Sequence, residues 1–338
     1  MISVDKRSAV MLTLAVLVLM TLAYLSVRDT DSVETELGRL VFTDLNASLD
    51  QVTQVRINLG QQAVSLEKQA GEWRVVDRKG YSADMPQVSR LLRSLADMVY
   101  LEPKTSRPER FVSLSLANKD AQQGAATYVE LQAPNQLWSL LVGAAPVNRG
   151  GQYIRLPAQD QAWLVDQRLM LDSSPAQWLS PVILNVDSEQ VKTVILSRQN
   201  AGMVKIGNIS AASGEIENAR VTNLPGDVSV TYTGAADEVT RALVNLRLQD
   251  VQALNNIDWQ DAIAAQFELV DNKTLLIRGV MVAGECWISV SLGSDFSPQE
   301  RLIYGLGDDV EQWAYKVSQY NYQLLARQMV DFIEAEAL

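Results

Sequence analysis

Two stretches of the chain share one pattern of apolar and polar positions. Residues 80–98 read GYSADMPQVSRLLRSLADM, and residues 231–249 read TYTGAADEVTRALVNLRLQ. Five positions are identical at a separation of 151 residues: Tyr81, Val88, Arg90, Leu92 and Leu95 recur as Tyr232, Val239, Arg241, Leu243 and Leu246. Apolar residues at helical spacing predict one amphipathic helix in each stretch. Two unrelated amphipathic helices can share five positions, so the order of the surrounding elements has to decide between coincidence and a repeat.

Short segments with partial alternation of apolar and polar residues surround both helices, and such segments predict strands. In the first half they cover residues 52–59, 63–68, 72–78, 127–133, 137–143, 152–157 and 162–166. In the second half they cover residues 191–198, 202–208, 228–234, 267–272, 274–282, 286–292 and a run from 312 that leads into a last helix. The common order favours a repeat. We therefore predict an α+β fold with two similar sheet-plus-helix modules of mostly antiparallel strands, at residues 50–184 and 185–338.

The N-terminus carries the longest apolar run of the sequence. Residues 9–27 read AVMLTLAVLVLMTLAYLSV without a charge, and at 1.5 Å per residue such a helix spans roughly 28 Å, close to the thickness of a bilayer core. Lys6 and Arg7 precede it, and an acidic stretch follows Arg28. This asymmetry predicts a cytoplasmic N-terminus at 1–8, a transmembrane anchor at 9–27 and a tether at 28–49. A cleaved signal peptide is the alternative, although no A-x-A-like site closes the run.

Composition removes several classes of function. The 338 residues carry a net charge of −11, which argues against a nucleic-acid partner because phosphate binding needs a basic surface. The absence of histidine excludes Ser-His-Asp and Cys-His catalytic pairs. Cys286 lies in an alternating strand, and Asp308, Asp309 and Glu311 lack the spacing of a calcium loop. We therefore predict no catalytic residue, no metal and no cofactor.

Two groups of residues are candidates for special roles. The first is a structural motif of the repeat, which consists of Trp73, Tyr81, Asp84, Leu92, Leu95, Tyr232, Leu243 and Leu246. The second is a possible interaction surface near the C-terminus, formed by Tyr315, Tyr320 and Tyr322, for which packing in the core is the alternative.

The first half resembles a known family. The segment GEWRVVDRKGYSADMPQVSRLLRSLADM, with Trp73, Tyr81, Ala83 and Asp84 ahead of a leucine-rich helix, is similar to the signature of the DUF4340 family. The resemblance covers nearly the whole chain and is strongest from residue 50 to 185. One departure is FVSLSL at 111–116, where relatives carry a Tyr-Gly-Leu turn. The resemblance implies a bacterial envelope protein encoded beside an ABC-type permease and an auxiliary subunit of the gliding-motility type.

Together these observations predict a non-catalytic accessory or scaffold subunit of an ABC-type transport assembly. We expect it to be anchored in the bacterial inner membrane through residues 9–27, with a periplasmic C-terminal domain that contacts the permease and auxiliary membrane subunits. The alternative is a module that binds an envelope glycan or lipid in a cleft between the two modules. A hydrolase without a recognisable motif is the third possibility, because paired carboxylates can lie far apart in a sequence.

Overall fold

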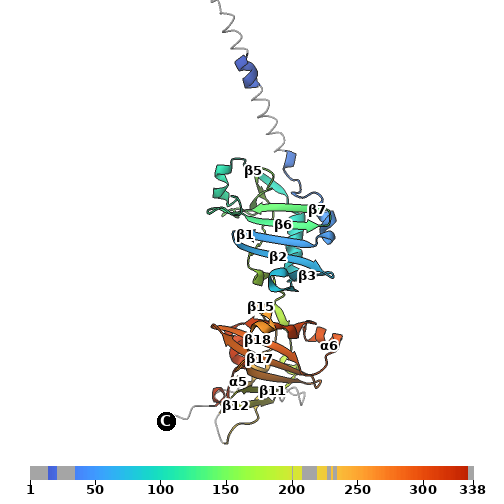
Figure 1. The fold of residues 1–338 in the computed structure, drawn as a ribbon, viewed down its shortest axis with the longest axis vertical. Helices are drawn as coiled ribbons and strands as arrows, with labels where there is room; N and C mark the ends of the chain where they lie inside the picture. Colours follow the sequence, from blue (N-terminus) through green and yellow to red (C-terminus); the bar gives the residue numbers. More distant parts are fainter. Residues whose placement is uncertain are drawn as a thin grey trace, which may run out of the picture. The chain divides into compact units, whose positions relative to one another are not determined.

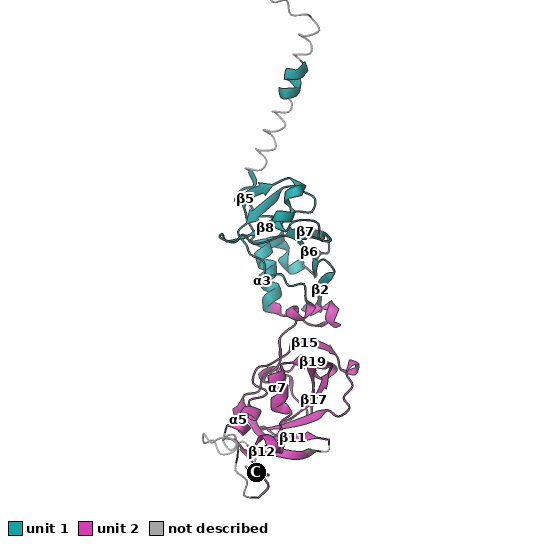
Figure 2. Ribbon diagram, turned by 90° about the vertical axis from the view of Figure 1, so that its left-hand side faces the viewer, with its two compact units in different colours: residues 1–72, 86–174 teal, residues 73–85, 175–338 magenta. Residues whose placement is uncertain are grey.

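The chain forms two compact units whose sequences interleave. The computed structural model describes residues 14–20, 35–199, 201–207, 219–226, 230 and 234–333. Unit 1 consists of Met1–Glu72 and Pro86–Ser174, and unit 2 consists of Trp73–Met85 and Pro175–Leu338 (Figure 2). The modules predicted at 50–184 and 185–338 were continuous stretches. In the structure the short segment 73–85 of the first half is a part of unit 2.

Unit 1 is built on an antiparallel sheet with the order β2-β1-β6-β7-β8-β9-β5 (Figure 1). Its strands are β1 (Gln54–Leu59), β2 (Gln62–Gln69), β5 (Tyr100–Thr105), β6 (Thr127–Ala133), β7 (Gln136–Val142), β8 (Gln152–Arg155) and β9 (Ala162–Val165). Its α-helices include α2 (Leu45–Ser48) and α3 (Met85–Ala96).

Unit 2 contains an antiparallel sheet of eight strands with the order β13-β12-β11-β16-β17-β18-β19-β15. These strands are β11 (Val191–Arg198), β12 (Ala201–Gly207), β13 (Arg220–Val221), β15 (Asp250–Ala253), β16 (Ile263–Leu269), β17 (Thr274–Val282), β18 (Glu285–Leu292) and β19 (Trp313–Val317). A separate two-stranded sheet joins β10 (Val182–Leu184) with β14 (Leu246–Arg247). The strands β3 (Glu72–Val75) and β4 (Tyr81–Ser82) pair with each other and open the nine-stranded order β4-β3-β2-β1-β6-β7-β8-β9-β5. The helices are α5 (Ala235–Thr240), α6 (Pro298–Ile303) and α7 (Gln319–Leu325).

The two sheets have the same strand order. Each strand of the unit 1 order β2-β1-β6-β7-β8-β9-β5 corresponds to the strand of unit 2 whose number is ten higher, from β12 to β15. In each sheet the last strand of this order lies at the edge and comes early in the chain: β5 lies beside β9 in unit 1, and β15 lies beside β19 in unit 2. If the two sheets had unrelated strand orders, the five identical residues shared by 81–95 and 232–246 would be a coincidence. The shared order is what a repeated structural unit produces.

The helices of the two units differ in length. In α3 the buried residues Val88, Leu91, Leu92, Leu95 and Ala96 form one stripe along the helix. The helix α5 is half as long, since it ends at Thr240, well inside the stretch 231–249 whose helical spacing predicted an amphipathic helix. Asn245 adopts a left-handed φ of 48° that no helix continues through, and Leu246 pairs with Leu184 in the β10–β14 ladder. Val239 is therefore buried on α5, whereas Leu243 and Leu246 are buried in a turn and a strand.

The predicted N-terminal transmembrane helix is not found. In the described part of the chain, no helix is both long and apolar enough to cross a membrane. This finding overturns the single-pass anchor at 9–27 and the placement of the protein in the bacterial inner membrane with a periplasmic domain. Within that stretch residues 14–20 are helical, which corresponds to about 10 Å at 1.5 Å per residue, and the rest of 9–27 lies outside the described residues.

Part of the predicted tether belongs to the core of unit 1. Leu45 is fully buried, and Val41 and Phe42 are 9% exposed; Val52, just after the predicted tether, is fully buried as well. The backbone N–H of Val41 donates to the carbonyl of Met98 at 2.8 Å, which fixes this entry segment to the residues that follow α3. Residues 40–52 thus fold as an integral part of the unit because their apolar side chains find a buried site there.

Leu92 and its counterpart Leu243 provide a test of the repeated core. Leu92 is 8% exposed and Leu243 is fully buried, so replacement of either by alanine removes buried apolar area and leaves a cavity. We expect Leu92→Ala and Leu243→Ala each to lower the free energy of unfolding by about 2–5 kcal/mol, measured by urea denaturation. The control Leu101→Ala, at a side chain that is 49% exposed, should change it by less than about 0.5 kcal/mol. Equal effects at all three positions would contradict the packing described here.

Candidate functional site

Most residues of the predicted structural motif lie in the cores of their own units. The side chains of Trp73, Tyr81, Leu92, Leu95, Leu243 and Leu246 are at most 8% exposed. Asp84 is half-buried and lies directly before α3, where its backbone N–H donates to the carbonyl of Trp178 at 2.8 Å. Tyr232 lies outside the described residues. The buried members act in packing.

Tyr81 packs into an aromatic cluster of unit 2. Its ring lies 5.3 Å from the ring of Trp313 and 6.2 Å from that of Tyr315, with both pairs near perpendicular. Such edge-to-face pairs are favourable beyond the area that they bury. Burial raises the pKa of Tyr81 well above its ordinary value, and the negative charge of Asp309 adds to the shift. Burial raises the pKa of Tyr315 in the same direction.

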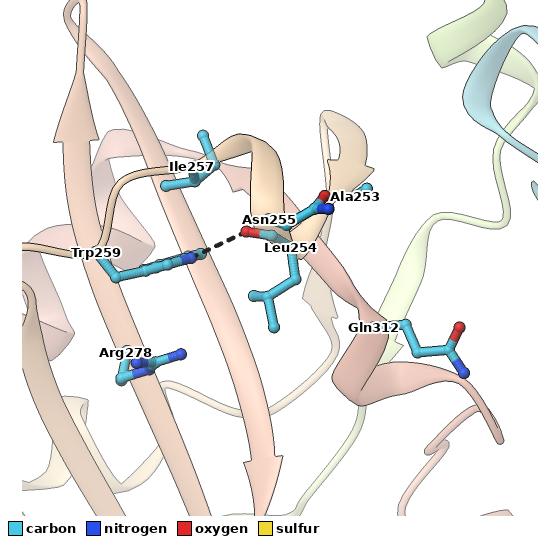
Figure 3. A pocket seen from close by; sticks show the side chains of 7 residues that line it. All are labelled: Ala253, Leu254, Asn255, Ile257, Trp259, Arg278 and Gln312. Atoms are coloured by element: carbon cyan, nitrogen blue, oxygen red, sulfur yellow. Dashed lines mark hydrogen bonds between the residues drawn. The ribbon is translucent and has the colours of Figure 1, made fainter.

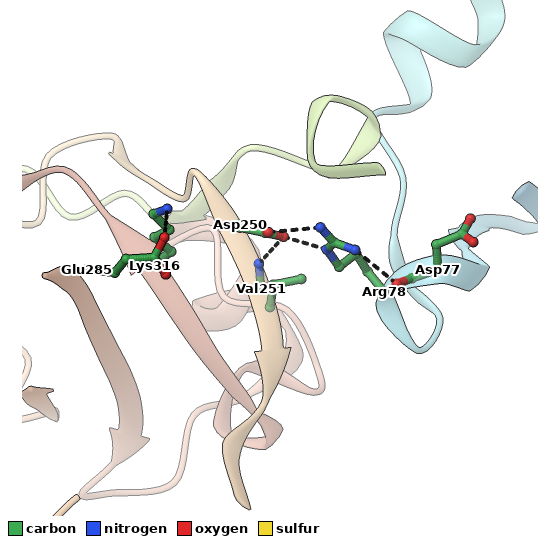
Figure 4. Close-up of polar contacts among 6 residues, drawn as sticks. All are labelled: Asp77, Arg78, Asp250, Val251, Glu285 and Lys316. Carbon is green, nitrogen blue, oxygen red and sulfur yellow. Dashed lines mark hydrogen bonds and ion pairs between the residues drawn. The ribbon is translucent and has the colours of Figure 1, made fainter. Parts of the chain in front are cut away.

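A forked ion pair fixes the same segment of unit 2. The Nε of Arg78 lies 2.6 Å from Oδ1 of Asp250, and its Nη2 lies 2.9 Å from Oδ2 (Figure 4). Asp250 is the first residue of β15, and its Oδ1 also accepts the N–H of Val251 at 2.8 Å. A second ion pair joins Arg74 and Asp309 at 3.6 Å. Residues 73–85 are therefore held in unit 2 by aromatic packing and by two charge pairs.

The three tyrosines of the predicted interaction surface are not exposed alike. Tyr315 is 2% exposed, and its hydroxyl donates to the carbonyl of Val310 at 3.0 Å. Tyr320 on α7 is 62% exposed, and Tyr322 on the same helix is half-buried. Tyr315 thus belongs to the core, and only Tyr320 of the three offers a large exposed face.

The connection from β15 to β16 builds a hollow on one face of the unit 2 sheet. A 3-10 turn (η7, Leu254–Asn256) follows β15, and Ile257 then packs with Trp287 and Ala314 of the sheet. The hollow has a volume of about 500 Å³. Asn255 and Gln312 supply side-chain amides to its lining, and Leu254, Ile257 and Ala253 supply apolar surface.

An indole and a guanidinium lie together in this hollow (Figure 3). The Nε1 of Trp259 donates to the carbonyl of Leu254 at 3.1 Å, which holds the ring in place. The guanidinium carbon of Arg278, on β17, lies 5.3 Å from the centre of that ring. A cation at this distance over an indole face is attracted by the ring quadrupole. The lining therefore combines a flat aromatic group, a cation, amides and apolar surface.

The helix α6 presents two large apolar side chains to solvent. Leu302 is 82% exposed and Ile303 is 59% exposed. The helix is fixed at its start by a capping box, in which Ser297 and Glu300 exchange side-chain and backbone hydrogen bonds. The backbone N–H and hydroxyl of Ser297, and then Lys273 at 3.2 Å, lower the pKa of Glu300.

The tyrosine at the C-terminal end of α6 ties the helix to the turn between β16 and β17. The hydroxyl of Tyr304 donates to Asp271 at 2.8 Å. Burial, together with that hydrogen bond, raises the pKa of Tyr304 to about 12. Both ends of α6 are thus fixed while Leu302 and Ile303 remain exposed.

Two members of the acidic cluster Asp308, Asp309 and Glu311 make contacts that stabilise the fold, and the cysteine is buried. Asp309 pairs with Arg74, and a side-chain oxygen of Glu311 accepts the N–H of Leu292 at 2.9 Å. Among the described residues, no group of acidic or cysteine side chains is arranged to hold a metal ion. Cys286 is buried, and burial raises the pKa of its thiol, which disfavours the reactive thiolate.

Sequence reasoning did not single out Trp259, Arg278, Asn255 or Gln312. They lie on different elements, since Arg278 is on β17 and Gln312 ends the 3-10 turn η8 (Val310–Gln312). One signal was available in the sequence. Trp259 stands in the polar stretch NNIDWQD, between segments that form strands, and an aromatic residue in a polar connection is a candidate for a binding surface.

The fold defines a class of protein: a chain of two units whose antiparallel sheets share one strand order. A family model described as "Domain of unknown function (DUF4340)" matches residues 73–252. The chain belongs to this family. The match begins at Trp73, the first residue of the segment that unit 2 takes from the first half. No curated protein and no solved structure matches the chain.

The buried tyrosines predict a loss of stability in alkali. The pKa of a buried tyrosine is higher in the folded chain than in the unfolded chain, where it is about 10. The stability that this difference contributes is fully present below the unfolded pKa, and it is lost as the pH rises through the folded pKa. We expect the unfolding midpoint in urea to fall above pH 10, and to fall less steeply in Tyr81→Phe, which keeps the ring in the cluster with Trp313. The same steepness in both proteins would show that Tyr81 does not titrate on unfolding.

Proposed function

We propose that the chain is a non-catalytic accessory or scaffold subunit that binds a partner protein, and that its partner belongs to an ABC-type transport assembly. The observation that carries the proposal is the pair of exposed aliphatic side chains on α6. Leu302 and Ile303 are adjacent, 82% and 59% exposed, and carried by a helix that is fixed at both ends. Apolar side chains on a fixed element lose little conformational freedom when they are buried against a partner.

The choice of partner rests on the family. The resemblance to DUF4340 relatives implies an association with a permease and an auxiliary subunit. The hollow of unit 2 is consistent with a binding role, because its lining consists of aromatic, cationic, amide and aliphatic groups. None of these lining residues is a carboxylate, a thiol or a hydroxyl that would act as a general acid, a general base or a nucleophile.

Replacement of the two side chains tests the proposed function. The full chain carrying Leu302→Ser and Ile303→Ser should recover at least about tenfold less of the permease and auxiliary subunits in affinity purification, quantified by mass spectrometry. Its unfolding midpoint should remain close to that of the unchanged chain, because exposed side chains contribute little to stability.

The matched control is Met203→Ser, which removes another apolar side chain of unit 2 that is 54% exposed. It should leave recovery unchanged. Full recovery with the double variant, or the absence of transporter subunits from the unchanged chain, would refute the proposal.

A second function is favoured by a separate observation. The hollow beside Trp259 is shallow and open, and it combines apolar surface with a few polar groups, which is the composition of small-molecule sites. Its volume of about 500 Å³ lies within the range of about 300–1,000 Å³ that is typical of such sites. This supports the recognition of an envelope glycan or lipid, at a place within unit 2.

A further inference from the structure

We propose that the hollow of unit 2 binds a carboxylated sugar, and that Arg278 selects it by pairing with the carboxylate. The inference rests on the second proposed function, ligand recognition at this hollow, and names the chemical class of the ligand. It is independent of the contact through Leu302 and Ile303.

The first observation is the state of the guanidinium. Arg278 is half-buried, and among the described residues its charge has no hydrogen bond and no ion pair; its described contact is the stacking on Trp259 at 5.3 Å. Arg78, by contrast, is paired with Asp250. The planar fork of a guanidinium matches the two oxygens of a carboxylate, so a free, oriented guanidinium in a hollow favours an anionic ligand.

The second observation concerns the sheet beneath the hollow. Ser289 is the cross-strand neighbour of Arg278, and Ala314 is the neighbour of Ser289, so the three side chains share one face of the sheet. Ala314 packs with Ile257 of the connection that covers this face. The hydroxyl of Ser289 is buried without a hydrogen-bond partner among the described atoms. A buried polar group without a partner is costly, so the hydroxyl of Ser289 beneath Arg278 calls for an explanation.

The other lining groups favour a sugar over a simple acid. The amides of Asn255 and Gln312 both donate and accept hydrogen bonds, as vicinal hydroxyls require. Leu254 and Ile257 offer apolar surface to the C–H face of a pyranose ring. Arg278 is the charged residue of this lining, so a ligand with one negative charge neutralises it.

Unit 1 contains a similar but closed contact, in which the arginine lies on β8, whereas Arg278 lies on β17, the counterpart of β7. There the connection from β5 to β6, residues 106–126, contributes Phe111, whose ring centre lies 4.6 Å from the guanidinium carbon of Arg155 on β8. Arg155 is 6% exposed, and its Nη1 donates to the carbonyl of Gln159 at 3.0 Å. In both units, therefore, an arginine of the sheet stacks on an aromatic residue of the connection that follows the edge strand, β5 in unit 1 and β15 in unit 2. The longer connection of unit 1 buries its arginine, and the shorter connection of unit 2, residues 254–262, leaves Arg278 in a hollow.

The experiment uses the full chain and two sugars that differ in a carboxylate. Binding of glucuronate and of glucose is measured by calorimetry and by saturation-transfer NMR at low salt. We expect glucuronate to bind at least about tenfold more tightly than glucose, and the difference to shrink at high salt as the charge is screened. Glucose 6-phosphate, acetate and a short acidic peptide are measured beside them.

Variants assign the preference to Arg278. Arg278→Gln should reduce glucuronate binding to the level of glucose, and Arg278→Lys, which keeps the charge without the fork, should retain part of the preference. The control Arg241→Gln removes an exposed charge of the same unit and should change nothing. Unfolding curves of each variant show whether the fold is intact; if Arg278→Gln is unfolded, the comparison of Arg278→Lys with the unchanged chain decides.

Each other outcome overturns a defined part of the account. Equal binding of glucose and glucuronate would leave ligand recognition standing and refute the role of the charge. Tighter binding of glucose 6-phosphate, of acetate or of the peptide through Arg278 would refute the carboxylated sugar as the ligand. Failure of every probe to bind would refute both the inference and the second function, while recovery of transporter subunits through Leu302 and Ile303 would be unaffected.

Discussion

The forked ion pair between Arg78 and Asp250 fixes the strand from which the hollow of unit 2 is built. Asp250 opens β15, an edge strand of four residues, and the chain runs directly from β15 into η7 and Trp259. A short edge strand is the weakest part of a sheet, since it is paired on one side. The pair with Arg78 is partly exposed and is worth about 1 kcal/mol after screening. Together with the packing of Tyr81 on Trp313 it sets the position at which the connection from β15 to β16 starts.

The segment 73–85 holds β15 in position within unit 2. The segment provides Trp73 and Tyr81 to the core and Arg74 and Arg78 to the charge pairs. The family match runs from residue 73 to residue 252, so it spans this segment and all of β15 except the last residue of the strand. The matched region thus contains both partners of the forked ion pair.

Part of this architecture could be predicted from the sequence. Alternation predicted most strands of both sheets, and the shared residues of 80–98 and 231–249 indicated the repeat that the common strand order displays. The edge strands β5 and β15 were not predicted, because Pro103 interrupts the first and four residues are too few to show alternation in the second. Helical spacing alone also failed at Leu243, where a turn buries the same side chain that a helix would have buried.

The hollow could not be predicted in the same way. Trp259, Arg278 and Gln312 lie on a connection, a central strand and a 3-10 turn, and only the strand order brings them together. The exposed pair on α6 depends on the fold as well. Leu302 and Ile303 are apolar, but both are exposed on a helix that is fixed by the capping box and by the hydrogen bond of the tyrosine that follows them.

Site-specific crosslinking in cells tests most directly the central claim that unit 2 acts by binding a partner through α6. A photoreactive amino acid placed at Leu302 in the full chain should crosslink to a permease or auxiliary subunit of an ABC-type assembly, whereas the same group at Met203 should not. Crosslinks from Leu302 to the transporter subunit, identified by mass spectrometry, are the predicted result. Equal crosslinking from both positions, or none to a transporter subunit from Leu302, would contradict the account.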